Sequence, residues 1–302
     1  MIYMLVCPIC KNPLLKEAVQ YSCQNCGKTY PDKEGIIQFV RDTLNEEQYF
    51  PDNAFEILYQ SEEKNFWFRV RNEIIGDTIT RYLSPQSRIL EVGCGTGYVS
   101  QYLKKIGYHV ECADLFFDAL QFCKERDAGD LYYQYNLSDR VFIEEFDGIC
   151  AFDVLEHIDD DSDVLNNVHD ALKPGGTLFI TVPADQRLWS EMDIYSEHKR
   201  RYSMQELRVK IEGNGFKVIK MSYFMTLLYP CILLSRKFSL RTKNLNDEDM
   251  KKQIKKEVMN ELQPNVIINI LFFLIFLLEV PLLSSVTLPF GSSLLCVAVK
   301  EP

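Results

Sequence analysis

Four cysteines near the N-terminus have the residue type and spacing of metal ligands. Cys7 and Cys10 form one Cys-x-x-Cys pair, Cys23 and Cys26 form a second, and twelve residues separate the two pairs. Four thiolates in two close pairs suit a tetrahedral zinc ion, and such a closed site has a structural role. We therefore predict structural zinc here and expect the other six of the ten cysteines to be scattered. The alternative is four unrelated buried thiols.

Three alternating glycines could bring a backbone loop close to a nucleotide. Gly93, Gly95 and Gly97 follow the apolar run 89–92, and a helical pattern begins directly after them. Glycine allows a sharp turn and a close approach to a ligand, and the helix N-terminus offers free N–H groups. A strand, a glycine loop and a helix in this order begin a nucleotide-binding α/β unit.

The segments after this loop alternate between strand and helix patterns. Strands are expected at 108–114, 131–137, 146–152, 177–183, 215–223 and 293–300. Asp114 ends the first of these, at the distance from the loop where an acid can accept hydrogen bonds from ribose hydroxyls. The alternation predicts a parallel sheet with the functional site at the carboxyl ends of its strands.

Three motifs in combination resemble the class I, Rossmann-like methyltransferases that use S-adenosylmethionine (SAM). They are Glu-Val-Gly-Cys-Gly-Thr-Gly at 91–97, Asp-Val-Leu-Glu-His at 153–157 and Leu-Lys-Pro-Gly-Gly at 172–176. The resemblance implies an α/β fold with a seven-stranded sheet, in which six strands are parallel and the last is antiparallel. It also implies the cofactor SAM, bound by Glu91, Gly93, Gly95, Gly97, Asp114, Leu115, Asn136, Leu137 and Phe152.

Two further points qualify this resemblance, which covers residues 88–183. Many members of the family have Asp at the position of Asn136, although an amide can still bond the adenine amino group. The cysteine segment, with Tyr30-Pro31-Asp32 after it, resembles the small zinc ribbons that precede several methyltransferases.

Methyl transfer to oxygen or nitrogen usually needs a base, and two histidines are candidates. His157 follows the fourth strand, and His198 lies in the loop after the fifth. An unperturbed histidine titrates near neutral pH and can therefore accept a proton. His157 could instead be a packing residue of the motif. A third possibility, implied by quinone-type relatives, is a divalent cation held by Asp153, Glu156 and His157.

Substrate contacts are expected from two segments. Trp67 and Arg71 lie in an aromatic stretch that leads into a helix, and Asp193, Arg201 and Tyr202 lie in the polar loop after the fifth strand. Loops at this edge of an α/β sheet commonly carry function. The alternatives are a hydrophobic contact between linker and core for the first segment and a salt-bridged structural loop for the second.

We divide the chain into a zinc ribbon (1–41), a linker with the helix that leads into the first strand (42–87), and a methyltransferase domain (88–302) with a helical insertion at 224–285. In the insertion, Val266 to Leu278 is apolar but shorter than the ~20 residues that span a bilayer. Together with Lys251, Lys252, Lys255 and Lys256 it could dock on an anionic membrane surface. The alternative interpretations of the apolar residues in this insertion are a buried helical pair that covers the sheet and a dimer interface.

The formal net charge of −10 argues against nucleic acid as the main partner. We read no signal peptide, so we expect a cytoplasmic protein, at most at the inner face of the membrane. The predicted function is methyl transfer from SAM to a small or lipid-linked substrate, such as a glycan, polyprenyl or quinone-like molecule. The alternatives are a zinc-ribbon rRNA base methyltransferase and an inactive SAM-binding scaffold protein. The oligomeric state is left open.

Overall fold

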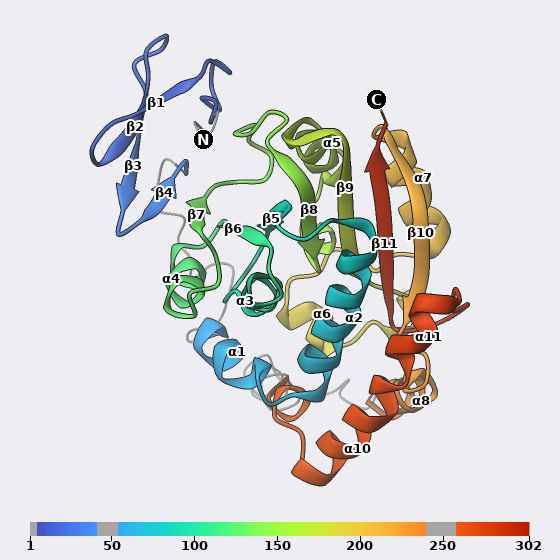
Figure 1. Cartoon of the computed structure of the whole chain (residues 1–302). Helices are drawn as coiled ribbons and strands as arrows, with labels where there is room; N and C mark the ends of the chain where they lie inside the picture. The colour runs from blue at the N-terminus through green and yellow to red at the C-terminus, as the bar shows by residue number, and fades with distance from the viewer. Residues whose placement is uncertain (1–4, 41–53, 240–257, 302) are drawn as a thin grey trace.

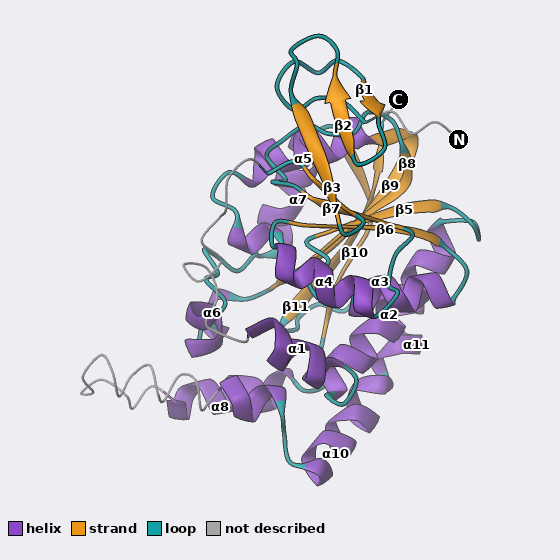
Figure 2. Cartoon of the chain, turned by 90° about the vertical axis from the view of Figure 1, so that its left-hand side faces the viewer, coloured by secondary structure: helices purple, strands orange, loops and turns teal. Residues whose placement is uncertain are grey.

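The protein has an α/β fold built on one twisted sheet with helices on both faces (Figures 1 and 2). The computed structural model describes residues 5–40, 54–239 and 258–301. The central strands lie in the order β7-β6-β5-β8-β9-β11-β10, and among them only β11 runs antiparallel to its neighbours. Their bounds are β5 Arg88–Val92, β6 His109–Asp114, β7 Leu131–Gln134, β8 Phe146–Phe152, β9 Leu172–Pro183, β10 Phe216–Phe224 and β11 Ser293–Lys300. This confirms the Rossmann-like fold expected from the sequence.

Alternation along the central strands fills a hydrophobic layer on each face. In β5, Leu90 and Val92 enter the first layer and Ile89 enters the second. The first layer is covered by α5 (Asp161–Ala171) and α7 (Met204–Gly213), and the second by α2 (Phe66–Tyr82), α3 (Tyr98–Lys105) and α4 (Phe117–Glu125). Figure 2 shows α5 and α7 on the side of the sheet opposite to α3 and α4. Because both faces are covered, most residues of β5, β6, β8, β9 and β11 are buried.

The N-terminal strands continue the same sheet. They are β1 (Leu14–Lys16), β2 (Gln20–Cys23), β3 (Thr29–Lys33) and β4 (Ile36–Gln38), and they pair antiparallel with one another. β4 then pairs in parallel with β7, so the described part of the chain forms an eleven-stranded sheet. The cysteine segment is therefore joined to the large sheet by backbone hydrogen bonds.

The strand expected at 177–183 begins earlier than the sequence pattern indicated. β9 starts at Leu172, directly after α5 ends at Ala171. Leu172 pairs with Phe146 and Thr177 pairs with Gly148, so the Lys-Pro-Gly-Gly segment bulges between two paired positions. Gly175, with φ of 75°, supplies the left-handed backbone that this bulge requires.

The remaining helices lie at the carboxyl edge of the sheet or beside it. They are α1 (Ala54–Glu62), the 3-10 helices η2 (Leu155–His157) and η3 (Gln186–Leu188), α6 (Glu191–Tyr195), α8 (Tyr229–Ser239), α10 (Val266–Leu277) and α11 (Glu279–Ser285). α7 begins with a reciprocal capping box formed by Ser203 and Glu206. α10 packs on α2, where Phe66 contacts the rings of Phe272 and Phe276 edge-on.

Candidate active site

A cavity of about 1090 Å³ opens where the parallel strands end. Its walls are the glycine loop, the residues after β6, β7 and β8, the start of α2, the segment 192–201 and part of the insertion between 258 and 272. Segments that are distant in the sequence therefore meet at one edge of the sheet, as expected for a parallel α/β fold.

The structure brings most of the predicted cofactor residues to this cavity. Glu91, Gly93, Gly95, Asp114, Leu115, Asn136, Leu137 and Phe152 all line it. Asp114 is the best placed to hold a ligand. One of its carboxylate oxygens accepts a hydrogen bond from the Gly95 N–H at 2.8 Å and the other accepts from the Phe116 N–H at 3.0 Å. A carboxylate has about four acceptor sites, so Asp114 can still accept from ligand hydroxyls.

Glu91 is a buried acid at the floor of the cavity. Its carboxyl group accepts a hydrogen bond from the Ser100 hydroxyl. Burial raises the pKa of Glu91 to about 8, although the Ser100 hydrogen bond opposes the shift. At neutral pH this acid is therefore mostly protonated in the ligand-free protein.

Gly97 differs from the other two glycines of the loop, since it does not line the cavity. It begins α3 with φ of 79°, and a Cβ atom there would lie 2.5 Å from the Cys123 sulfur and 2.7 Å from the Ala128 Cβ. The loop needs glycine at 97 because α3 packs against α4 and the segment after it. In this structure Gly97 has a packing role, and its predicted contact with the cofactor stays a prediction.

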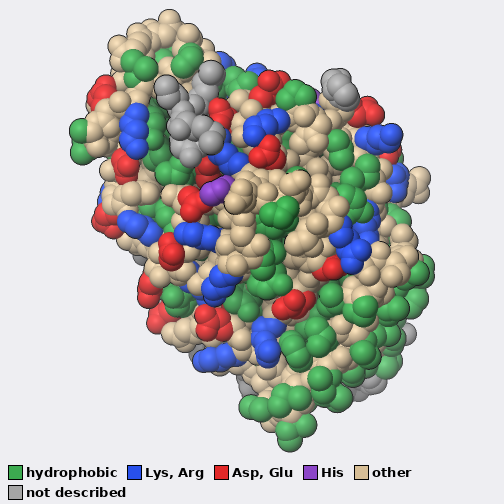
Figure 3. Space-filling view, in the orientation of Figure 1, with side chains coloured by type: hydrophobic (Ala, Val, Ile, Leu, Met, Phe, Trp, Pro, Cys, Tyr) green, Lys and Arg blue, Asp and Glu red, His purple; other side chains and the backbone are tan. Residues whose placement is uncertain are grey.

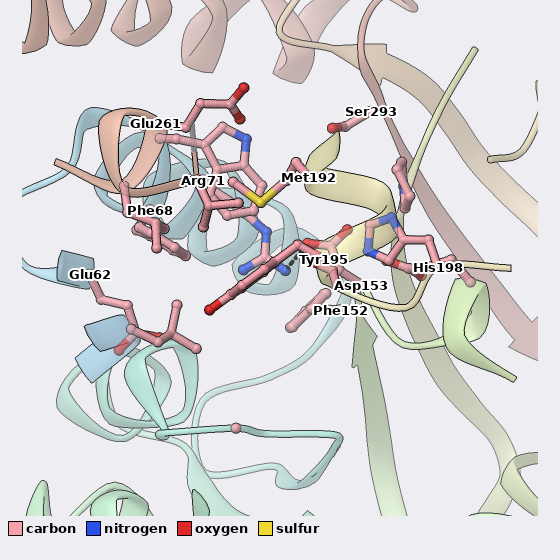
Figure 4. A pocket seen from close by; sticks show the side chains of 18 of the residues that line it. Glu62, Phe68, Arg71, Phe152, Asp153, Met192, Tyr195, His198, Glu261 and Ser293 are labelled. Carbon is pink, nitrogen blue, oxygen red and sulfur yellow. Dashed lines mark hydrogen bonds and ion pairs between the residues drawn. The ribbon is translucent and has the colours of Figure 1, made fainter. Parts of the chain in front are cut away.

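Arg71 crosses the cavity wall from α2 toward the end of β8. Its guanidinium donates to a carboxylate oxygen of Asp153 at 2.6 Å and to the Thr181 hydroxyl at 3.3 Å. The guanidinium also lies 4.9 Å from the Trp67 ring centroid, a cation–π distance. Figure 4 shows Arg71 of α2 directed into the cavity, together with Tyr195 and His198 of the segment 192–201.

The two candidate histidines lie edge to face, with ring centroids 4.8 Å apart. The Nδ1 atom of His198 is 2.8 Å from a carboxylate oxygen of Asp193, and Arg201 donates to both oxygens of that carboxylate at 2.8 and 2.9 Å. Burial opposes ionisation of Asp193, but the hydrogen bonds from His198 and Arg201 hold its pKa well below its usual range. Asp193 is fully buried and does not line the cavity, so it orients His198 and Arg201, which do.

Glu156 is fully buried, and His157 is partly buried next to it. Burial, together with the neighbouring His198, lowers the pKa of His157 to about 4. Neither carboxylate oxygen of Glu156 has a hydrogen-bond partner among the described residues, and burial raises the pKa of Glu156 well above its ordinary value. Glu156, His157 and His198 offer three ligand atoms within 4.8 Å of one another, an arrangement that could hold a divalent cation.

Tyr202 is not part of the cavity wall, contrary to our expectation. Its hydroxyl donates to Asp161 at 2.7 Å, and the side chain is packed under η2 in the hydrophobic layer. The side chain therefore anchors the 192–201 segment to α5. A tyrosine can use its hydroxyl for a hydrogen bond in the core or for a contact with a ligand. The sequence does not distinguish these two roles.

Several cavity residues were not predicted. Tyr195 and Met192 belong to the same polar loop, and the argument that led to Asp193 and Arg201 could have included them. Glu62 had no such signal. It lies in the segment that we read as a linker, yet it pairs with Arg126 and accepts from the Thr96 hydroxyl at 2.6 Å. α1 is thereby anchored to the glycine loop.

The four N-terminal cysteines converge. The Cys10 and Cys23 sulfurs are 3.3 Å apart, those of Cys7 and Cys26 are 3.6 Å apart, and the four ligand atoms all lie within 4.8 Å of one another. Sulfurs on a tetrahedral zinc ion, with bonds of about 2.3 Å, are separated by about 3.8 Å. The donor set therefore fits zinc.

The expectation that the other cysteines are scattered is wrong. Cys94, Cys112 and Cys123 are all buried, with their sulfurs within 4.8 Å of one another. They come from the glycine loop, β6 and α4, which meet in the second hydrophobic layer. A thiol is small and apolar enough to fill such a layer, and close packing then brings the three sulfurs together.

A parallel sheet in this strand order, with a glycine loop hydrogen-bonded to the acid of the next strand, defines a nucleotide-binding α/β protein. The chain belongs to the class I SAM-dependent methyltransferases. Residues 59–221, just over half of the 302, match the Methyltransf_23 family model, described as a methyltransferase domain.

Individual relatives agree with this family. The ubiquinone biosynthesis O-methyltransferase of Xylella fastidiosa is 31% identical over 101 residues, which cover 32% of this chain and 41% of the relative. The mitochondrial ubiquinone biosynthesis O-methyltransferase of Candida albicans is 29% identical over 189 residues, which cover 55% of each chain. The chain thus spans about half, or less, of the length of these curated relatives.

A solved structure shows the same fold. It is a chain from the complex between the Haloferax volcanii Trm112 methyltransferase activator and a methyltransferase, with a TM-score of 0.55 and 15% identity. The match covers 87% of this chain and 100% of that chain. At such identity the likeness concerns the fold alone.

The different surroundings of Gly97 and Gly95 lead to a stability prediction. Gly97→Ala should lower the free energy of unfolding by about 3 kcal/mol, because a left-handed backbone and a steric overlap both oppose the methyl group. Gly95→Ala is the matched control. It also has a positive φ, but its Cβ would have no neighbour within 4 Å, so only about 1 kcal/mol should be lost. Urea denaturation of the ligand-free protein measures both; equal losses would contradict the packing role of Gly97.

Proposed function

We propose that this protein transfers the methyl group of SAM to a hydroxyl group of a quinone-like or other lipid-linked small molecule. One observation carries the proposal. The glycine loop with Asp114 faces, across a single cavity, a group of ionisable side chains that includes Arg71, His157 and His198. The names of the curated relatives favour a quinone-type substrate over an rRNA base.

In this proposal the cofactor occupies the half of the cavity nearest the glycine loop. SAM supplies an electrophilic methyl group, so the chain mainly has to align donor and acceptor. Asp114 accepts hydrogen bonds from the ribose hydroxyls, and Asn136 and Leu137 flank the adenine. Gly93 and Gly95 allow close approach of the backbone, and Phe152 with Leu115 packs against the ligand.

The base in this proposal is His198 rather than our first choice, His157. When the Nδ1–H group of His198 donates a hydrogen bond to Asp193, the Nε2 atom carries a lone pair and can accept the proton of the substrate hydroxyl. The buried Asp193 carboxylate then stabilises the imidazolium. Burial lowers the pKa of His157 to about 4, so His157 accepts a proton less readily than an ordinary imidazole, and its ring packs against that of His198. A divalent cation is the alternative. Its ligands would be Glu156, His157 and His198, since the expected ligand Asp153 pairs with Arg71 instead of joining that group.

One wall of the substrate half of the cavity is aromatic and aliphatic, and a guanidinium group lies beside it. Phe66, Trp67 and Phe68 of α2 and Ile268 and Phe272 of α10 line it, and Arg71 lies beside them. Such a wall suits a flat ring with an apolar tail better than a phosphodiester backbone. The Trp67 ring and the Arg71 guanidinium are the proposed contacts to the ring of the substrate, with Arg201 at the far side.

The cofactor part of the proposal predicts a loss of binding in Asp114→Ala. Calorimetry should show SAM binding weakened by about 1–3 kcal/mol, because the ribose hydroxyls lose a buried acceptor. Asp118→Ala, which changes an exposed acid on α4, is the control and should leave the affinity unchanged. An unchanged affinity in Asp114→Ala would remove this residue from the site.

The catalytic part of the proposal is tested with methyl-labelled SAM and lipid or quinol extracts. His198→Gln should lower kcat by about 10²–10⁴-fold with little change in SAM affinity, because a general base is lost. His109→Gln, at an exposed position far from the cavity, is the control. SAM binding by the wild type without turnover on any lipid or RNA extract would favour the inactive scaffold. Recovery of turnover on adding a divalent cation would favour the metal alternative.

We also infer structural zinc on Cys7, Cys10, Cys23 and Cys26, on the strength of their converging sulfurs. Protein purified under reducing conditions should contain about one zinc ion per chain by elemental analysis. Cys26→Ser should lower this content strongly, whereas Cys231→Ser, an exposed cysteine outside the cluster, should not. Zinc-free wild-type protein would refute the site.

The insertion supports a contact with a lipid surface. α10 and α11 carry an outward row of apolar side chains, in which Ile267 is 77% exposed and Leu278 is 61% exposed. Figure 3 shows hydrophobic side chains gathered over these two helices at the lower right of the molecule. On its other side α10 lines the cavity through Ile268 and Phe272. A lipid-linked substrate could therefore pass from a membrane into the cavity beside this helix.

Our expectation that this segment is too short to span a bilayer needs correction. Among the described residues, Val266–Ser285 is a 20-residue stretch long and apolar enough for a span, by length and composition only. It is nevertheless anchored in the fold. The Glu279 carboxylate is fully buried and accepts from the Leu227 N–H at 2.6 Å, and Phe276 and Leu283 are buried beside it. A span would break these contacts, so we propose a peripheral contact.

Vesicle flotation tests this contact. Wild-type protein should float with anionic vesicles at low salt. The double variant Ile267→Glu, Leu271→Glu should not float, because insertion would move two charged side chains into the apolar part of the bilayer. Val209→Glu, at an exposed position of α7, is the control. Higher salt should weaken binding if the four lysines at 251–256, which lie outside the described residues, face the headgroups. If the wild-type protein does not float at low salt, the proposed lipid contact is wrong, and the insertion is instead a buried helical pair or a dimer interface.

A further inference from the structure

We propose that the N-terminal cysteine module, defined as residues 5–40, positions the adenine side of the SAM site from outside the cavity. This inference rests on the proposed binding of SAM at that site. None of the described residues of the module lines the cavity. The module must therefore act through elements that it contacts, which include β7, the segments at each end of it, and α4, where Lys124 and Gln121 donate to Glu34.

Main-chain pairing joins the module to β7. Ile36, Ile37 and Gln38 of β4 pair in parallel with Tyr132, Tyr133 and Gln134. The Phe39 N–H then donates to the Gln134 carbonyl at 2.8 Å. Without β4, β7 would be the edge strand of the central sheet, with one row of unpaired backbone groups. The carboxyl end of β7 leads within two residues to Asn136, the proposed adenine contact.

A side-chain relay continues from β4 to the cofactor loop. The Gln38 amide donates to the Gln134 side-chain oxygen at 2.6 Å, and the Gln134 amide donates to the Leu115 carbonyl at 3.1 Å. Leu115 lines the cavity directly after Asp114. Because the Gln134 oxygen is occupied by Gln38, its NH₂ group is directed at Leu115. The module thus orients a residue that ties the end of β7 to the turn after β6.

The module also contacts the far end of the adenine segment. The Val6 N–H donates to the Val141 carbonyl at 2.8 Å, and Leu5 forms a β-bridge with Phe142. Residues 135–140, which contain Asn136 and Leu137, therefore lie between two anchor points, Gln134 and Val141. Both points are hydrogen-bonded to the module.

The cysteine cluster is coupled to these anchor points by packing. The Tyr30 hydroxyl lies 3.1 Å from the Cys7 sulfur, and its ring packs against Phe39 with centroids 5.1 Å apart. Cys7 follows Val6 directly, so the cluster and the Val141 contact share one short segment. A metal ion on the four thiolates would hold the β1–β2 and β3–β4 strands in this arrangement, because ligand binding to a small module stabilises its folded form.

The main experiment compares full-length protein with and without metal. Removing the metal with a chelator should raise the Kd for SAM roughly tenfold, as expected if about a tenth of the molecules keep the adenine segment in its binding geometry. Hydrogen exchange should accelerate in residues 131–142 as well as in 5–40, with β8 and β9 unchanged. Adding zinc back should restore both. An unchanged Kd, exchange limited to residues 5–40, or exchange accelerated throughout the sheet would each overturn the proposal.

A variant that keeps the four cysteines isolates the relay. Gln38→Leu should weaken SAM binding about three- to tenfold, the effect of one lost hydrogen bond, while zinc content and thermal stability stay close to wild type. Gln20→Leu makes the same change on β2 of the module, where the amide contacts only Glu17 in the described structure, and should leave SAM binding unchanged. Equal affinities in both variants would overturn the relay. If metal-loaded wild type fails to bind SAM, the proposed function fails instead.

Discussion

The hydrogen bond between the Asp114 carboxylate and the Gly95 N–H joins the ends of two adjacent strands, and the site is built around it. It requires a loop that turns back across the edge of the sheet, which glycines with positive φ allow. It also requires an acid at the end of β6 that is buried beneath the loop. With these two strand ends locked together, every later strand delivers its terminal residues to the same cavity. The parallel direction of the strands thus converts a local contact into a site.

Two carboxylates, the partly exposed Asp153 and the fully buried Asp193, orient the ionisable groups on the opposite side of the cavity. Asp153 pairs with Arg71, and Asp193 pairs with His198 and Arg201. Each partner is a long or ring-bearing side chain that would otherwise sample several rotamers. Removing these charges from water is costly, and the cost is offset only when the hydrogen bonds are well formed. The result is a set of cavity groups held in fixed directions, which is what alignment of a nucleophile requires.

The cavity is supported from two opposite ends of the chain. The N-terminal module extends the sheet beside β7, near the proposed adenine side, and the insertion before β11 covers the proposed substrate side through α10. Figure 1 shows the two at opposite corners of the molecule. The N-terminal module is therefore near the proposed cofactor site, and the insertion is near the proposed substrate site. A mutation in one of them need not disturb the other.

The sequence alone determined the sheet, its glycine loop and the residues that end its strands. Strand and helix periodicity and the family motifs occupy short stretches of sequence. Asp114 and His157 could therefore be assigned to the cavity edge in advance, and Asn136 by the resemblance to the methyltransferases. The paired spacing of Cys7, Cys10, Cys23 and Cys26 is local as well.

Tertiary structure decided which distant side chains meet. Tyr202 hydrogen-bonds to Asp161, Gly97 packs against α4, and Glu62 forms an ion pair with Arg126. Packing of three elements also brings together the sulfurs of Cys94, Cys112 and Cys123. Tertiary structure also joined β4 to β7. The reason is physical: backbone geometry is encoded by neighbouring residues, whereas contacts between loops depend on how whole elements pack.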